Sequence, residues 1–243
     1  MTDDPTFVCL DSEVPADLLT LVEDKAVEIR PDNEGRVFEA NADPLRFWAT
    51  GTELRVRFLD GQDLVRRVMD AASAWTEHAN LTFTVVDNDS AHIRVTFIGS
   101  GNWSALGIES VTPQVYPLDR PSMCLAEVPR AISSLRVDRV VRHEFGHALG
   151  LRHEHQSPAA GIRWNKRAVY EALAEPPNSW PKEKVDRDVF QRYSATTTSF
   201  TQFDPKSIML YTYPPEWTED GRGFPMNHEL STNDREFIRK TYP

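Results

Sequence analysis

A histidine-rich motif near the middle of the chain constrains its fold more than any other feature. His143 and His147 are four residues apart, which places both imidazoles on the same face of an α-helix. Gly150 can adopt a positive φ and end that helix, so that His153 reaches the same point from another direction. Three neutral imidazoles around an open position are typical of a catalytic zinc site. Glu144, beside the first histidine, can take a proton from water there, so the motif predicts a zinc hydrolase.

A second motif follows downstream, where Ser207, Met209 and Tyr211 occupy alternate positions. Met209 alone would also suit an irregular gap in a core. The pattern HExxHxxGxxH resembles that of the metzincin metallopeptidases, which carry a methionine turn beneath the zinc. Ser-x-Met-x-Tyr, together with Glu154 directly after His153, resembles the astacin branch of that family. The resemblance implies that Tyr211 is an additional zinc ligand or stabilises the transition state, because a phenol can donate a hydrogen bond to a developing oxyanion.

The resemblance covers roughly Arg46 to Pro243, and two departures from the family pattern stand out. Animal astacins usually carry two disulfides in the catalytic domain, whereas this chain has only Cys9 and Cys124, so it resembles the disulfide-poor microbial members. In astacins the glutamate that corresponds to Glu154 holds the amine of the mature N-terminus. Residues 1–45 precede the catalytic domain here, so that role requires cleavage, and an ordinary carboxylate is the other interpretation of Glu154.

Cys9 has three interpretations. It can be a thiol without a special role, a disulfide partner of Cys124, or a latency ligand whose thiolate caps the zinc. Residues 1–45, which are acidic and rich in turn residues, are either an N-terminal extension or a latency segment, with one apolar stretch that can form a short helix. The sequence leaves these alternatives open.

The hydrophobic pattern before the histidine motif predicts an α/β (α+β) fold. We expect strands over residues 53–59, 81–86 and 91–97, because apolar residues alternate there, and a helix over 63–79 with apolar residues at helical spacing. An order of strand, helix, strand, strand is typical of an α/β lobe with a twisted sheet. The resemblance to metzincins implies that this sheet is mostly parallel. Residues 99–127, rich in Gly, Pro and Ser, are expected to add a hairpin or edge strand and a long loop.

The chain changes character after the third histidine, which predicts a two-lobed catalytic domain with a cleft between the lobes. The first lobe is expected to contain two long helices. The second lobe is expected to be mostly irregular or helical. Its predicted elements are short helices over 164–174 and 181–193 and a final helix capped at Ser231. We therefore divide the chain into three parts. Residues 1–45 are an N-terminal extension or latency segment, residues 46–153 are a first lobe that ends in the histidine motif, and residues 154–243 are a second lobe with the methionine turn.

Composition excludes several other classes. A formal net charge of −10 argues against sequence-independent nucleic-acid binding. No apolar run is long enough for a membrane span, and the N-terminus lacks the basic start and apolar region of a signal peptide. The protein therefore stays inside the cell, leaves by another route, or has lost its leader in this sequence, so its location stays open. No Gly-x-Ser-x-Gly motif is present, which disfavours a serine hydrolase.

These features together favour a zinc-dependent endopeptidase with one catalytic zinc, acting as a monomer on a protein or peptide. The family resemblance implies a substrate chain bound extended along an edge strand. Two alternatives are a zinc-stabilised binding module that has lost turnover and a nonproteolytic zinc hydrolase. His155 lies two residues beyond a ligand, and we expect it to be solvated or to support the ligands, while His78, His92 and His228 are expected to be structural or surface residues.

Overall fold

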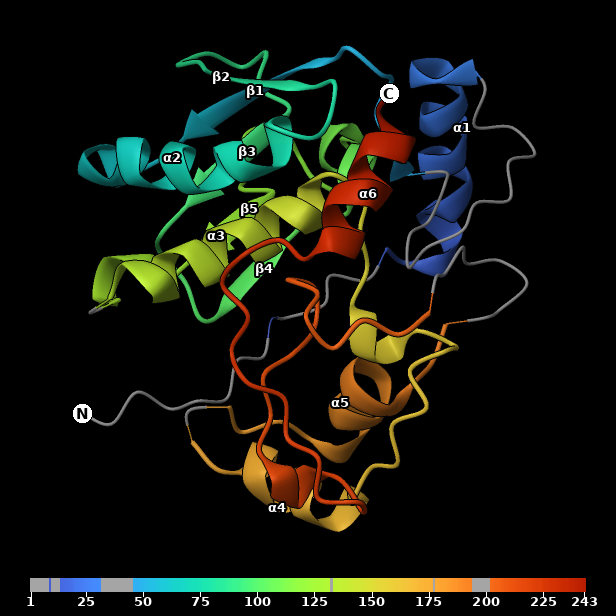
Figure 1. Cartoon of the computed structure of the whole chain (residues 1–243). Coiled ribbons are helices and arrows are strands. Elements are labelled where there is room, and N and C mark those ends of the chain that lie inside the picture. The colour runs from blue at the N-terminus through green and yellow to red at the C-terminus, as the bar shows by residue number, and fades with distance from the viewer. Residues whose placement is uncertain (1–8, 10–13, 32–45, 132, 177, 194–201) are drawn as a thin grey trace.

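The computed structural model describes residue 9 and residues 14–31, 46–131, 133–176, 178–193 and 202–243. Most of the expected N-terminal extension, namely residues 1–8, 10–13 and 32–45, lies outside these described residues. The strands and the two long helices form the upper half of Figure 1, and α4 and α5 lie in the lower half.

A five-stranded sheet forms the framework of the upper half, with strand order β2-β1-β3-β5-β4. The strands are β1 Glu53–Phe58, β2 Thr82–Val85, β3 Ile93–Thr96, β4 Asn102–Ser104 and β5 Met123–Leu125. β1 pairs in parallel with β2 and β3, and β3 pairs in parallel with β5, whereas β4 runs antiparallel to β5. The predicted mostly parallel sheet is confirmed, and the segment 99–127 supplies the two short strands at one edge.

The alternation that predicted the strands matches the burial of β1, where Leu54, Val56 and Phe58 lie in the core. β3 differs because it is buried along its whole length. β2 also differs, because Val85, one of its alternating apolar residues, is 48% exposed. β2 is the outermost strand on its side of the sheet, so its end has fewer neighbours to cover it.

Two long helices, α2 Val65–Thr76 and α3 Ser134–Ala148, lie side by side in Figure 1. Trp75 of α2 donates a hydrogen bond from its indole Nε1 to the carbonyl of Arg142, at 2.8 Å, which joins the helices at their contact. Phe145 of α3 meets Phe83 of β2 edge-on, with ring centroids 5.1 Å apart. The histidine motif is therefore carried by a helix that is packed against both α2 and the sheet.

The lower half contains short helices and irregular chain, as the sequence predicts. The helices α4 Lys166–Ala174 and α5 Lys182–Val185 are shorter than the expected segments. The last helix, α6 Thr232–Thr241, follows the Ser231 cap and lies in the upper half of Figure 1. Trp164 was expected at the start of α4, but Asn165 caps this helix. Trp164 instead forms an isolated β-bridge with Thr218. The expected helix over 181–193 changes at residue 186 into one π-turn that ends at Phe190.

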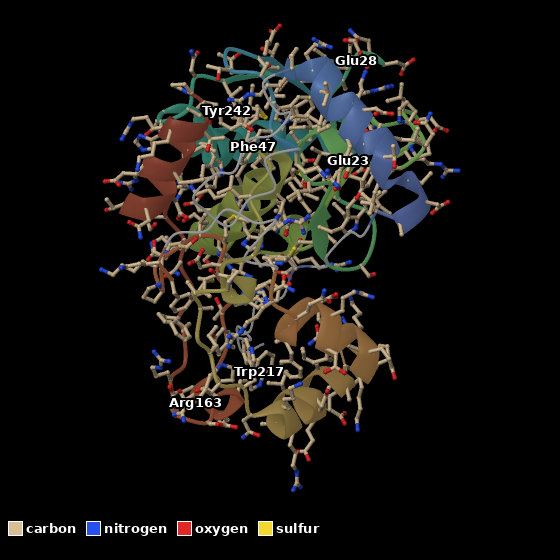
Figure 2. The ribbon with its side chains drawn as sticks, turned by 90° about the vertical axis from the view of Figure 1, so that its right-hand side faces the viewer. Glu23, Glu28, Phe47, Arg163, Trp217 and Tyr242 are labelled. Carbon is tan, nitrogen blue, oxygen red and sulfur yellow. The ribbon has the colours of Figure 1, made fainter. Side chains whose placement is uncertain are left out.

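Phe47 and Tyr242, which lie far apart in the sequence, pack beside the end of α3. Figure 2 shows Phe47 next to Tyr242, and their rings meet edge-on at 5.9 Å. Trp48 Nε1 donates to the carbonyl of Ala148 at 2.9 Å, and Tyr242 Oη donates to the carbonyl of Leu149 at 2.8 Å. These contacts hold the last turn of the helix where the chain must reverse.

The N-terminal helix α1, Leu19–Ile29, stands at the right of Figure 1 and realises the expected short helix. Figure 2 shows Glu23 and Glu28 along its length. Arg30, at its end, donates to the carbonyl of Trp48 at 3.2 Å, so the helix is attached to the segment that precedes β1. Among the described residues, no helix has both the length and the apolar character needed to cross a bilayer.

Candidate metal centre

The helix α3 begins at Ser134 and brings the motif into the interior. The Ser133 side chain accepts a hydrogen bond from Arg136 N at the start of the helix. His143, Glu144 and His147 follow two to four turns later, and their side chains are at most 4% exposed. Side chains of this polarity are rarely buried without a partner, so the burial of all three is a structural cost that points to a function.

Gly150 reverses the chain after α3. Its φ is +95°, and a Cβ there would lie 2.7 Å from Cδ1 of Phe47. Both the backbone conformation and the close approach of Phe47 therefore require glycine. The turn brings Leu151 back beside His147, whose Nδ1 lies 2.7 Å from the Leu151 carbonyl oxygen. As predicted, His153 then approaches the other two histidines from outside the helix.

The three histidines converge through their Nε2 atoms. His147 Nε2 lies 3.2 Å from His143 Nε2 and 3.1 Å from His153 Nε2. Zinc–nitrogen bonds of about 2.0–2.1 Å in a tetrahedron place two ligand nitrogens about 3.3–3.4 Å apart. The observed separations fall close to this value, so the three side chains fit one zinc ion.

The outer nitrogens of two histidines set the tautomer that a metal requires. His143 Nδ1 donates to the carbonyl of Ile208 at 2.8 Å, and His147 Nδ1 donates to that of Leu151. Because a carbonyl oxygen only accepts, each Nε2 carries a lone pair directed at the common point. Burial, reinforced by the positive charge of Arg139, lowers the pKa of His143 well below its ordinary value and keeps it neutral. Lone pairs that face one another in this way favour a cation between them.

Cys9 completes the group from the N-terminal segment. Its Sγ lies 3.5 Å from His147 Nε2 and 3.7 Å from Oε2 of Glu144, and the residue is 1% exposed. Cys9 and the three histidines form one buried set of ligand atoms that lie within 4.8 Å of one another. Cys9 and Cys124 are not joined by a disulfide, so that interpretation of Cys9 is wrong.

The methionine turn lies directly beneath the histidine helix. A Cβ on Gly146 would come within 3.3 Å of Cε of Met209 and closer still to its Sδ, so the helix and turn touch at this glycine. Glu154 N donates to the carbonyl of Met209 at 3.1 Å, which ties the turn to the residue after the third histidine. Met209 is 2% exposed, as expected both for a methionine turn and for a core residue.

Two buried charged side chains hold this turn from either side. Arg139 donates to the carbonyls of Ile208 and, at 2.5 Å, Leu210. Asp234, at the start of α6, accepts from Ile208 N and from the Ser207 hydroxyl, both at 2.8 Å. The carbonyl of Ile208 also receives His143 Nδ1–H, so the arginine and the aspartate act on the residue that orients a ligand.

The predicted phenol lies beside the histidines and contacts two of them. The Tyr211 ring meets that of His153 at 4.5 Å and stacks on that of His155 at 4.1 Å. Its hydroxyl donates to the Cys9 carbonyl at 2.8 Å. His155 is 1% exposed, so the expectation that it might be solvated is wrong and its interpretation as a supporting residue fits. Two of its partners, Asp188 and Tyr211, are more than thirty positions away in the sequence.

Sequence reasoning did not single out Arg139 or Asp234. Asp234 lies three residues after the predicted cap Ser231, and Arg139 has no motif of its own. Glu154 is 7% exposed and accepts from Asp204 N at 2.7 Å, but the N-terminal residues it would need to meet lie outside the described part. His92 is structural: it accepts from Arg55 N at 3.1 Å and packs on Trp48 at 5.3 Å.

Comparison with solved structures places this arrangement among known peptidases. A structure of myroilysin is 36% identical over 83% of this chain and 98% of its own chain, with a TM-score of 0.78. A crystal structure of myroilysin covers 98% of this chain and 99% of its own at 33% identity and a TM-score of 0.61. High choriolytic enzyme 1, a hatching enzyme zinc-protease from Oryzias latipes (medaka fish), covers 81% of this chain and 94% of its own at 18% identity and a TM-score of 0.54, and shares the fold. No protein-family model and no curated protein sequence matches the chain.

The fold and the buried histidine group therefore define a zinc metalloendopeptidase. Within that class, the chain belongs to the astacin-like metzincin family.

Proposed function

We propose that the protein cleaves internal peptide bonds, with zinc held by His143, His147 and His153 and Glu144 acting as the general base. The observation that carries this proposal is the convergence of three Nε2 atoms at 3.1–3.2 Å, two of them fixed by carbonyls behind the ring. When bound at such a site, zinc lowers the pKa of a coordinated water toward about 7 and polarises a carbonyl.

Glu144 is the proposed carrier of the proton. It is fully buried, and its Oε2 lies 3.7 Å from Cys9 Sγ, which is itself 3.5 Å from His147 Nε2. In the proposed reaction Glu144 accepts a proton from the attacking water, the water oxygen bonds to the peptide carbon, and the C–N bond breaks. Glu144 then gives that proton to the leaving nitrogen and returns to a carboxylate, so protons balance over the cycle.

Tyr211 is the proposed donor to the oxyanion. Its hydroxyl donates at 2.8 Å to the main-chain carbonyl of Cys9, beside the metal-binding histidines. A phenol that already binds a peptide carbonyl here can bind the carbonyl oxygen of a substrate and strengthen that bond as negative charge develops. Tyr211 can also serve as an additional metal ligand in a chain without substrate.

We further propose that Cys9 keeps the intact chain latent. Tetrahedral zinc with one thiolate at about 2.3 Å places that sulfur about 3.5–3.6 Å from a ligand nitrogen. The separation between Cys9 Sγ and His147 Nε2 is 3.5 Å. A thiolate in the fourth position excludes the water that Glu144 must deprotonate, so residues 1–45 act as a latency segment until Cys9 is withdrawn. Removal would also create the mature N-terminus that Glu154 can hold.

For the substrate we propose a protein or peptide chain that lies extended along β4. This strand is the last in the sheet order and runs antiparallel to β5, and it lies against α3. An extended peptide can add to such an edge through backbone hydrogen bonds. We propose that the catalytic domain has two lobes that meet at His153, covering residues 46–153 and 154–243, and that it acts as a monomer.

Cleavage of casein by matched variants tests the proposal. The zinc-loaded Cys9→Ala chain should cleave casein faster than the intact chain, and 1,10-phenanthroline should abolish cleavage. Cys124→Ala is the control, because Cys124 is the other buried thiol, on β5, and the buried set of ligand atoms contains Cys9 and the three histidines but not Cys124.

Glu144→Gln in the Cys9→Ala background should retain zinc and lose cleavage. Cleavage at the reference rate would show that Glu144 is not the base. Zinc binding without chelator-sensitive cleavage, in both Cys9→Ala and a chain lacking residues 1–45, would instead favour a zinc-stabilised binding module.

A further inference from the structure

His155 makes the closest ring contact of the proposed oxyanion donor. The imidazole of His155 and the phenol of Tyr211 stack with centroids 4.1 Å apart and planes 30° apart. Both residues are 1% exposed. Buried, near-parallel rings at this distance restrict each other, because neither can rotate without losing the contact.

The far side of His155 is anchored to the π-turn. Its Nε2 donates to the main-chain carbonyl of Asp188 at 3.0 Å. The helical turn ends at Phe190, so this carbonyl belongs to the last turn, whose oxygens lack helical donors. The Asp188 side chain is fully buried and accepts from Arg187 Nε at 2.6 Å and from Lys184. The carbonyl that holds His155 is therefore itself held in place.

The opposite end of this chain of contacts is the hydroxyl of Tyr211. It donates to the Cys9 carbonyl at 2.8 Å, while the phenol also meets the His153 ring at 4.5 Å and 61°. A hydrogen bond weakens steeply when its angle departs from linearity, so the value of this donor depends on how well the ring is held. The aromatic neighbours of Tyr211 thus control how well its hydroxyl is oriented as a hydrogen-bond donor.

We propose that His155 is the positioning residue for Tyr211. The π-turn fixes the imidazole, the imidazole fixes the phenol, and the phenol is thereby directed at a peptide carbonyl beside the metal-binding histidines. The proposal rests on the function proposed above for Tyr211. It assigns His155 a role through stacking, separate from metal binding, and makes the π-turn part of the catalytic architecture.

The kinetic test uses the zinc-loaded Cys9→Ala chain as reference. His155→Ala should lower kcat about tenfold with little change in KM, because an interaction formed in the transition state is weakened. His155→Phe, which keeps an aromatic ring, should retain more of kcat than His155→Ala. Phe190→Ala is the matched control. Phe190 lies on the same π-turn and contacts Trp164 and Tyr170, so its removal loosens the packing around the π-turn but leaves the stacked rings of His155 and Tyr211 in place.

A double-mutant cycle separates positioning from general damage. In a Tyr211→Phe background, His155→Ala should cause no further loss of kcat, because the hydroxyl that it positions is already absent. The same pattern should appear in the affinity for a phosphinic peptide, measured by calorimetry at one zinc ion per chain. An equal tenfold loss in both backgrounds would overturn the proposal.

A crystal structure of the intact His155→Ala chain provides a readout that needs no peptidase activity. The Tyr211 hydroxyl should leave the Cys9 carbonyl or become disordered; an unchanged bond at 2.8 Å with an ordered ring would overturn the proposal. If the Cys9→Ala reference neither cleaves casein nor binds the phosphinic peptide, the proposed function fails. The crystal comparison then decides separately whether His155 positions Tyr211.

Discussion

Replacement of Gly146 by alanine tests the contact between the histidine helix and the methionine turn. The new Cβ would lie 3.0 Å from Cζ2 of Trp75 and 3.3 Å from Cε of Met209, and still closer to Sδ. Ordinary carbon contacts are about 3.5–4.0 Å, so Met209 must move. Its backbone is held because Met209 N donates to the Ser207 hydroxyl at 3.0 Å and its carbonyl accepts from Glu154 N.

The expected magnitude follows from two opposing effects. Overpacking of a close-packed core costs about 1–3 kcal/mol. Alanine in place of glycine inside a helix returns about 1 kcal/mol. The net loss for Gly146→Ala is therefore about 1 kcal/mol. Met209→Ala alone should cost about 2–5 kcal/mol, because it opens a cavity beneath the helix.

The double variant distinguishes contact from coincidence. In Gly146→Ala/Met209→Ala the new methyl group occupies part of the space that the methionine side chain leaves. The loss of unfolding free energy in the double variant should therefore be about 1–3 kcal/mol smaller than the sum of the losses in the two single variants. Denaturant unfolding at equal free zinc concentrations supplies all four values. Additivity within about 0.5 kcal/mol would refute the proposed contact.

Two further predictions concern residues that support the centre. Burial, followed by the charge of Arg55, lowers the pKa of His92 from 6.5 to about 4. The neutral form is thus favoured by folding, and the stability it contributes is complete above pH 6.5 and is lost as the pH falls toward 4. The melting temperature of the wild type minus that of His92→Gln should therefore decline over this interval, whereas a constant difference would contradict the assignment. Arg139→Lys should weaken zinc binding about 10- to 100-fold in competition with a chromophoric chelator, because one ammonium replaces the fork that holds the Ile208 and Leu210 carbonyls; unchanged affinity would exclude that role.

The histidine ligands were predictable because their geometry is local. A four-residue spacing on a helix and a glycine three residues later determine where His143, His147 and His153 point, with little help from the remaining chain. The first strand was predictable for a related reason, because the alternating apolar residues of β1 match its alternating burial. The parallel pairing came from the family resemblance instead, since β3 is buried along its whole length and shows no alternation.

The supporting residues could not be found in this way because their partners are distant in sequence. Arg139 meets carbonyls about seventy positions away, and the π-turn that anchors His155 begins thirty-one residues after it, at Asp186. A side chain whose role depends on which segment folds over it carries no periodic signal. His155 was therefore open to a solvent-exposed interpretation, although Asp188 and Tyr211 enclose it.

The three interpretations of Cys9 illustrate the same limit. A lone cysteine near the N-terminus carries no spacing information, so sequence reasoning could only set out alternatives. Both cysteines are free thiols, which excludes the interpretation of Cys9 as a disulfide partner of Cys124. The short distance from Cys9 Sγ to His147 Nε2 supports its interpretation as a latency ligand. The deciding contact spans 138 positions.

Diffraction from crystals of the zinc-loaded chain, measured on both sides of the zinc absorption edge, tests the central claim most directly. The account predicts one anomalous peak about 2.0–2.1 Å from the Nε2 atoms of His143, His147 and His153, and in the intact chain about 2.3 Å from Cys9 Sγ. A peak bound by other residues, or no peak among the three histidines at full zinc occupancy, would contradict it.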